Sequence, residues 1–160
     1  MQLRPHPKGG FAVWLNDSEA QRIIDYWEDN AELDNAMEKK IAVKCMYRCG
    51  LRADDLKNVT RGNIRRLDTE DEAYVLRVEE SKRGYRETPL PVELKTEIMA
   101  LAGAKGLKQN ERVFQLAKRT YQRAVENVVP IIAEETGNDD WELISAHDLR
   151  RSWATRCYYK

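Results

Sequence analysis

The sequence lacks an excess of charge of either sign. Its 27 lysine and arginine residues equal its 27 aspartate and glutamate residues, so the formal net charge at pH 7 is zero. A chain without net charge has no overall electrostatic attraction to nucleic acid or to an anionic membrane. Any surface that binds a polyanion must therefore be local, built from a few basic side chains that gather in the fold.

Two further absences narrow the class of protein. No apolar run is long enough to span a bilayer, and no signal peptide opens the chain, so we expect no membrane partner. The only cysteines are Cys45, Cys49 and Cys157, an odd number without histidine partners at zinc-ligand spacing. We therefore expect no metal and no cofactor, two small buried thiols at Cys45 and Cys49, and a reducing cytoplasm.

The remaining composition is that of one globular domain, with 42% hydrophobic and 34% charged residues. Residues 1–11 carry two prolines and two glycines and are predicted to be a linker-like segment, in which His6 is a bystander. Residues 12–160 are predicted to form the domain itself.

Helical patterns occupy most of that domain. The capping-box spacing of Asn16 and Glu19 predicts a helix that runs to about Asp29. A second helix is predicted from about Glu32 to Arg48, with Gly50 as its stop and a short helix after it. Its predicted apolar stripe is Leu33, Met37, Ile41 and Cys45.

Further helices are predicted in the second half of the chain. One carries Leu94, Ile98 and Leu101, and another begins near Lys118 with a kink at Pro130. The last begins at the Ser145-x-x-Asp148 cap, and its residues Leu149, Trp153 and Cys157 are expected to face the core.

Between the helices lie three short strand-like segments, residues 63–67, 73–79 and 86–90, joined by polar turns. Lys82 is expected at the tip of the second hairpin. The predicted fold class is therefore α+β, mainly helical, with a small three-stranded antiparallel sheet.

Four residues have the chemistry needed to cleave a phosphodiester without a metal: Arg52, Lys82, His147 and Arg150. An arginine guanidinium binds phosphate with two parallel hydrogen bonds and keeps its charge at any working pH. A lysine or histidine can supply the proton that the leaving oxygen needs. His147 and Arg150 fall at i and i+3 and share one helix face, and Asp55 could orient Arg52. Taken singly, Arg52 and Lys82 are better explained as ordinary surface residues, and His147 could simply support the first turn of its helix.

In combination these residues occur in three segments: Gly50-Leu-Arg-Ala-Asp-Asp-Leu56, Lys82 before Arg86-Glu-Thr-Pro-Leu90, and His147-Asp-Leu-Arg-Arg-Ser-Trp-Ala-Thr155. The chain here resembles the catalytic domain of the tyrosine recombinases, the phage-integrase family. The resemblance covers roughly residues 12–158, and the last segment is its strongest part.

The resemblance implies site-specific DNA recombination or integration through a covalent phosphotyrosyl intermediate, which needs no cofactor. It implies that Arg52 and Arg150 bind the scissile phosphate, that Lys82 protonates the leaving 5′ oxygen and that His147 assists. The nucleophilic tyrosine of the family lies well beyond the second arginine. Tyr158 and Tyr159 are too near Arg150, so we expect an incomplete catalytic domain, inactive alone, of a longer enzyme.

The expected partner is double-stranded DNA, bound by a homo-oligomer of the full-length protein. The basic face that opens the helix at Lys118 is the candidate for entry into a groove, although an exposed face without a partner explains it equally well. The predicted DNA-binding residues are Arg83, Arg86, Lys118, Arg119 and Arg123.

Two other functions fit the same residues. An integrase-like module could bind DNA or regulate a full-length partner without chemistry. A relative of the type IB topoisomerases would use a similar set of cations in a chain of different length.

Overall fold

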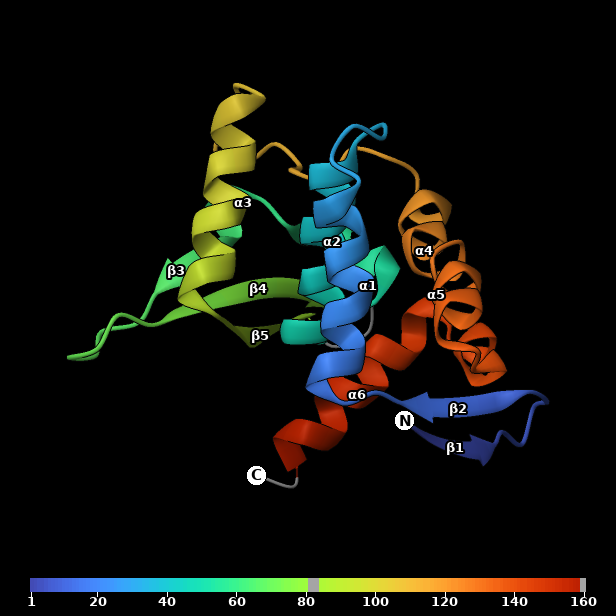
Figure 1. The fold of residues 1–160 in the computed structure, drawn as a ribbon. Coiled ribbons are helices and arrows are strands. Elements are labelled where there is room, and N and C mark those ends of the chain that lie inside the picture. Colours follow the sequence, from blue (N-terminus) through green and yellow to red (C-terminus); the bar gives the residue numbers. More distant parts are fainter. Residues whose placement is uncertain (81–83, 159–160) are drawn as a thin grey trace.

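The computed structural model describes residues 1–80 and 84–158 and confirms the predicted fold class, a mainly helical chain with one three-stranded antiparallel sheet (Figure 1). Within these residues, no helix is both long and apolar enough to cross a membrane. The elements in chain order are β1 (Gln2–Pro5), β2 (Phe11–Trp14), α1 (Asp17–Asp29), α2 (Ala36–Arg48), the 3₁₀ helices η1 (Ala53–Asn58) and η2 (Arg61–Asn63), β3 (Ile64–Arg66), β4 (Tyr74–Glu80), β5 (Gly84–Leu90), α3 (Val92–Ala104), α4 (Lys118–Glu126), α5 (Val129–Thr136), η3 (Asp139–Leu143) and α6 (Ala146–Tyr158).

Helix α2 lies at the centre of the molecule and buries residues in two hydrophobic clusters. Val43 and Met46 pack with α1, α4, α5 and α6, whereas Ile41 and Cys45 pack with α3 and the sheet. In Figure 1, α3 and the sheet flank α2 on one side and α4 and α5 on the other. A helix that is buried on more than one side has no single apolar stripe.

The stripe predicted for the second helix is partly wrong. Ile41 and Cys45 are buried, but Leu33 and Met37 are 41% and 62% exposed. The helix begins at Ala36 rather than near Glu32, because Asn35 adopts a left-handed conformation with φ of 55° and residues 30–35 form turns.

The prediction that residues 1–10 form no element of the fold is also wrong. Gln2–Pro5 pairs with Phe11–Trp14 as an antiparallel hairpin, with Pro5 opposite Phe11. The glycines that suggested a linker make the turn instead, since Gly9 and Gly10 have φ of 94° and 72°. The domain limits themselves remain a prediction.

The three predicted strands are confirmed and pair antiparallel in the order β3–β4–β5. The predicted kink at Pro130 is a break between two helices, with Pro130 in the first turn of α5, where its missing N–H costs nothing. On α6, Leu149 is fully buried and Trp153 half-buried, but Cys157 is exposed, so the predicted core face holds only for the first half of this helix.

Candidate active site

The first turn of α6 is held by the cap that the sequence predicts. The backbone N–H of Ser145 donates to Oδ2 of Asp148 at 2.8 Å, and its hydroxyl lies 3.1 Å from the same oxygen. Asp148 is 1% exposed, and its Oδ1 accepts from the N–H of Val13 in β2 at 3.1 Å and pairs with Arg151. One buried carboxylate thus joins the start of α6 to the N-terminal hairpin.

Gly50 brings the end of α2 against α6. Its φ of 68° is left-handed, and a Cβ at this position would overlap the indole ring of Trp153. Glycine is therefore required both by the backbone and by the close approach of a side chain. The carbonyl of Gly50 accepts a hydrogen bond from Nη1 of Arg150. This contact holds Arg150 against the segment that carries Arg52, two residues further along.

Arg52 is the N-cap residue of η1, and its side chain is exposed. Its backbone N–H donates to Oδ2 of Asp55 at 2.8 Å. The expectation that Asp55 orients the guanidinium of Arg52 is wrong, because this carboxylate caps the backbone and pairs with Arg86 instead. Among residues 1–80 and 84–158, no carboxylate forms an ion pair with the Arg52 guanidinium.

Arg86 has the opposite environment. Its guanidinium is half-buried on β5, with Nη2 3.2 Å from Oδ2 of Asp55 and Nε 2.8 Å from Oε1 of Glu80. Both carboxylates balance its charge. Arg86 therefore joins the sheet to η1 in this structure, and its predicted role in DNA binding remains a prediction.

The electrostatics of the site show that its cations lie close together. Burial lowers the pKa of Arg150, and Arg52 and Arg86 lower it further, against the opposing effect of Asp55 and Glu80. The neighbouring arginines repel the positive charge of this guanidinium. An anion bound between them would offset that repulsion.

The pKa of His147 is lowered as well. The side chain is exposed, and partial desolvation is the largest cause, followed by the positive charges of Arg151, Arg150 and Arg52 and by His6. Because the pKa falls below its ordinary value of 6.5, the imidazole is neutral at pH 7 in the free protein. Arg52, from one predicted motif, thus acts electrostatically on His147 and Arg150, from another motif about 100 residues away.

The other predicted residues lie elsewhere or cannot be placed. Lys82 and Arg83 fall outside the described residues. Lys118, Arg119 and Arg123 are exposed on α4, as the sequence suggests, but Arg119 is paired with Glu126 at 2.9 Å. They form a second basic region on another helix.

The predicted buried thiols are confirmed. Cys45 and Cys49 are both fully buried, and burial raises the pKa of Cys49 to about 12 and that of Cys45 well above its ordinary value. Thiols in this state are poor nucleophiles, so they contribute packing rather than reactivity.

With this geometry in place, comparison with known proteins identifies the family. The sequence model of the family described as "Phage integrase family" matches residues 13–160, which is nearly the whole chain. The chain belongs to the phage integrase family. A search among curated proteins found no match.

Solved structures of phage integrase relatives share the fold at low sequence identity. The XerH site-specific recombinase, bound to its difH substrate before cleavage, superposes with a TM-score of 0.71 at 18% identity over 99% of this chain and 45% of XerH. The XerA recombinase gives a TM-score of 0.64 at 16% identity, over 91% of this chain and 49% of XerA. The Tn1549 transposon integrase, in complex with transposon right end DNA, gives a TM-score of 0.61 at 15% identity, over 92% of this chain and 53% of the integrase chain. The chain thus spans about half the length of these relatives.

Sequence reasoning missed three parts of this candidate site. It treated Asp148 as a helix cap only, it assigned no contact to the carbonyl of Gly50, and it took His6 for a bystander. The spacing of Ser145 and Asp148 predicts only the cap and not the bond from Asp148 to Val13. All three missed contacts join residues about 100 or more positions apart and have no local signal.

Proposed function

We propose that this chain is part of the catalytic domain of a site-specific DNA recombinase, which cuts and rejoins DNA strands through a phosphotyrosyl intermediate. One observation carries the proposal. Arg52 and Arg150 both lower the pKa of His147, Arg52 also lowers that of Arg150, and Arg52 has no ion-pair partner among the described residues. Two guanidinium groups beside a neutral imidazole favour an anion with several acceptor oxygens, as in a phosphodiester.

In this mechanism Arg52 and Arg150 hold the scissile phosphate. Each guanidinium can donate two parallel hydrogen bonds, and the bond from Arg150 to the carbonyl of Gly50 fixes one of them before DNA arrives. Negative charge builds on the phosphate oxygens during transfer, so fixed positive groups stabilise the transition state more than the ground state. His147, neutral at pH 7, is suited to pass a proton to or from an oxygen of this phosphate.

The remaining roles fall to groups outside the described part of the site. We assign Lys82 as the donor of the proton to the leaving 5′ oxygen, and a tyrosine from polypeptide outside these 160 residues, in the same or another chain, as the nucleophile. Tyr158 lies on the same helix as Arg150 and is 88% exposed, and we do not assign it this role. The 160 residues alone would then bind DNA without cutting it.

The partner in this proposal is double-stranded DNA, and the full-length protein would assemble on it as a homo-oligomer. The exposed basic residues of α4 (Lys118, Arg119 and Arg123) would contact its backbone beside the site. Arg83 and Arg86 are the other candidates for such contacts.

Covalent trapping tests the proposed function. The protein translated from the complete reading frame is incubated with a nicked suicide duplex of its element ends, and denaturing gels reveal protein attached to a 3′ phosphate. We expect attachment by the wild-type protein and none by its Arg150→Ala variant. Binding without any attachment would favour the non-catalytic DNA-binding module, and absence of binding would refute both functions.

A further inference from the structure

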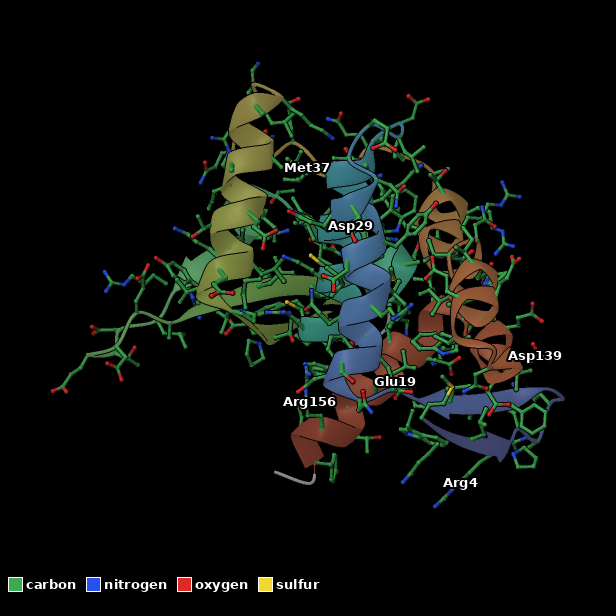
Figure 2. All side chains as sticks on the ribbon, in the orientation of Figure 1. Arg4, Glu19, Asp29, Met37, Asp139 and Arg156 are labelled. Carbon is green, nitrogen blue, oxygen red and sulfur yellow. The ribbon has the colours of Figure 1, made fainter. Side chains whose placement is uncertain are left out.

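The N-terminal hairpin differs in charge from the rest of the molecule. The chain as a whole has equal numbers of acidic and basic residues, yet its first sixteen residues contain Arg4, His6 and Lys8 and no aspartate or glutamate. Arg4 and Lys8 are exposed, and Figure 2 shows Arg4 reaching outward from the hairpin. In a chain of zero net charge, this is a local concentration of positive charge.

Side chains of α6 fix this hairpin against the helix that carries His147 and Arg150. The N–H of Val13 donates to Asp148, and the N–H of Leu15 donates to the hydroxyl of Ser152 at 2.8 Å. The later residue of the hairpin strand bonds to the later residue of the helix, so β2 and α6 run in the same direction. The turn at residues 6–10, which precedes β2, therefore projects toward and past the first turn of α6, where His147 lies.

A third contact holds the arginine of β1. The indole N–H of Trp14 donates to the hydroxyl of Thr155 at 2.9 Å, and the guanidinium carbons of Arg4 and Arg151 each lie 5.7 Å from the centre of the indole ring. A cation beside an aromatic ring keeps its full charge. Both Arg4 and Arg151 thus lie near the Trp14 ring, which does not neutralise Arg4.

His6 adds a donor in the turn itself. Its Nδ1 accepts the N–H of Lys8 at 3.1 Å, so the proton of the neutral ring is on Nε2. The ring is half-buried and near enough to His147 to act on it electrostatically. Together with the direction of β2, this puts the turn beside His147 and the two arginines of the candidate site.

We propose that the β1–β2 hairpin is a second phosphate-binding element, in which Arg4, His6 and Lys8 contact the DNA backbone next to the phosphate held by Arg52 and Arg150. The proposal rests on the proposed function and adds a separate subsite to it. The basic residues of the hairpin lie next to those of α6, so that together they form an extended basic surface. DNA fits such a surface because its phosphates form a continuous line of negative charge.

Salt-dependent DNA binding tests the hairpin directly. The affinity of the 160-residue chain for a short duplex is measured by fluorescence anisotropy between about 50 and 200 mM salt. The variant Arg4→Ala/Lys8→Ala removes two exposed charges, and Arg22→Ala/Lys108→Ala on α1 and after α3 is the matched control. Since each lost phosphate contact reduces the slope of log K against log salt by about 0.9, we expect a reduction of about 2 in the first variant and none in the control.

The outcomes separate this proposal from the function on which it rests. Wild-type binding with an unchanged slope in Arg4→Ala/Lys8→Ala overturns the hairpin subsite and leaves the proposed function standing. A wild-type chain that does not bind duplex DNA overturns both.

A second measurement checks the placement of the turn. Because His6 contributes to lowering the pKa of His147, the His6→Gln variant is expected to raise that pKa in an NMR titration, and an unchanged value would place the turn away from the site.

Discussion

Two basic regions of the molecule differ in how their charges are held. In the candidate site, Arg150 is half-buried and bonded to the carbonyl of Gly50, while Asp148 anchors the helix turn beneath it. On α4, Lys118 and Arg123 are exposed, and Arg119 is already paired with Glu126. The first region holds Arg150 in place before any ligand arrives, and the second presents long side chains that must be ordered on binding.

The difference indicates what each region can contribute to binding and chemistry. Fixed donors need little reorganisation when charge develops on a phosphate, which is the requirement for catalysis. Exposed lysines and arginines lose side-chain entropy on binding and serve affinity and salt-dependent attraction. The two regions are therefore expected to respond differently to mutation, with the larger effects in the fixed site.

The largest effect is expected for Gly50→Ala. The new Cβ would meet the ring of Trp153 in a backbone conformation that alanine adopts with strain. We expect a loss of about 2–5 kcal/mol in the free energy of unfolding, measured by urea denaturation, from the sum of backbone strain and overpacking.

Gly103→Ala is the matched control for this change. Gly103 lies in α3 with open space around it, so alanine should be neutral or stabilising there. If Gly50→Ala were as stable as Gly103→Ala, the close approach of α6 to the end of α2 would be wrong.

Arg52→Ala is expected to weaken binding rather than folding. The side chain is exposed, so the melting temperature should stay within about a degree or two of wild type. Loss of charge-assisted hydrogen bonds worth about 1.5–3 kcal/mol should reduce affinity for a nicked duplex by about tenfold or more in an anisotropy titration. Arg52→Lys should recover part of this loss, since lysine keeps the charge but not the two-pronged geometry. Equal affinity of Arg52→Ala and wild type would show that Arg52 is an ordinary surface residue.

A smaller and more uniform effect is expected for Arg119→Ala on α4. Its ion pair with Glu126 offsets part of its charge, and any phosphate contact carries no sequence information. Affinity should fall similarly for duplexes of different sequence, with a change of about 0.9 or less in the salt slope. A loss confined to one duplex sequence would indicate base contacts instead.

The smallest effect concerns the pH dependence of stability. Because the folded-state pKa of His147 is lowered, the unfolded chain binds the proton first as pH falls through about 6.5, and the folded state loses stability from there down to the lowered pKa. In His147→Gln this contribution is absent. The variant should therefore gain stability relative to wild type on going from pH 7 to pH 5, as followed by thermal denaturation. A constant difference over this range would contradict the lowered pKa.

Local patterns in the sequence predicted those parts of the fold that depend on near neighbours. The capping box of Asn16 and Glu19 and the cap of Ser145 and Asp148 were both confirmed, because each is formed by side chains three residues apart. The three strands were confirmed for a similar reason, since alternating residues and polar turns lie close in sequence.

Predictions that depended on distant contacts were less successful. Residues 2–5 were predicted as linker, but they form a strand, and the hairpin that they complete is held by Asp148 and Ser152 far along the chain. Cys157 follows the spacing of Leu149 and Trp153, yet its side chain is exposed, whereas its neighbour Arg156 contacts Asp17 and the carbonyl of Tyr47. The cations of the site were identified by their motifs, whereas their mutual effect became visible only in three dimensions.

The convergence of Arg52 with His147 and Arg150 is tested most directly by the pKa of His147 itself. The chain has only two histidines, so NMR titration of wild type, Arg52→Gln and Arg119→Gln resolves this imidazole, with His6→Gln for assignment. Since the charge of Arg52 helps to lower the pKa of His147, Arg52→Gln should raise it and Arg119→Gln should leave it unchanged. An identical pKa in wild type and Arg52→Gln would mean that these groups do not share one site.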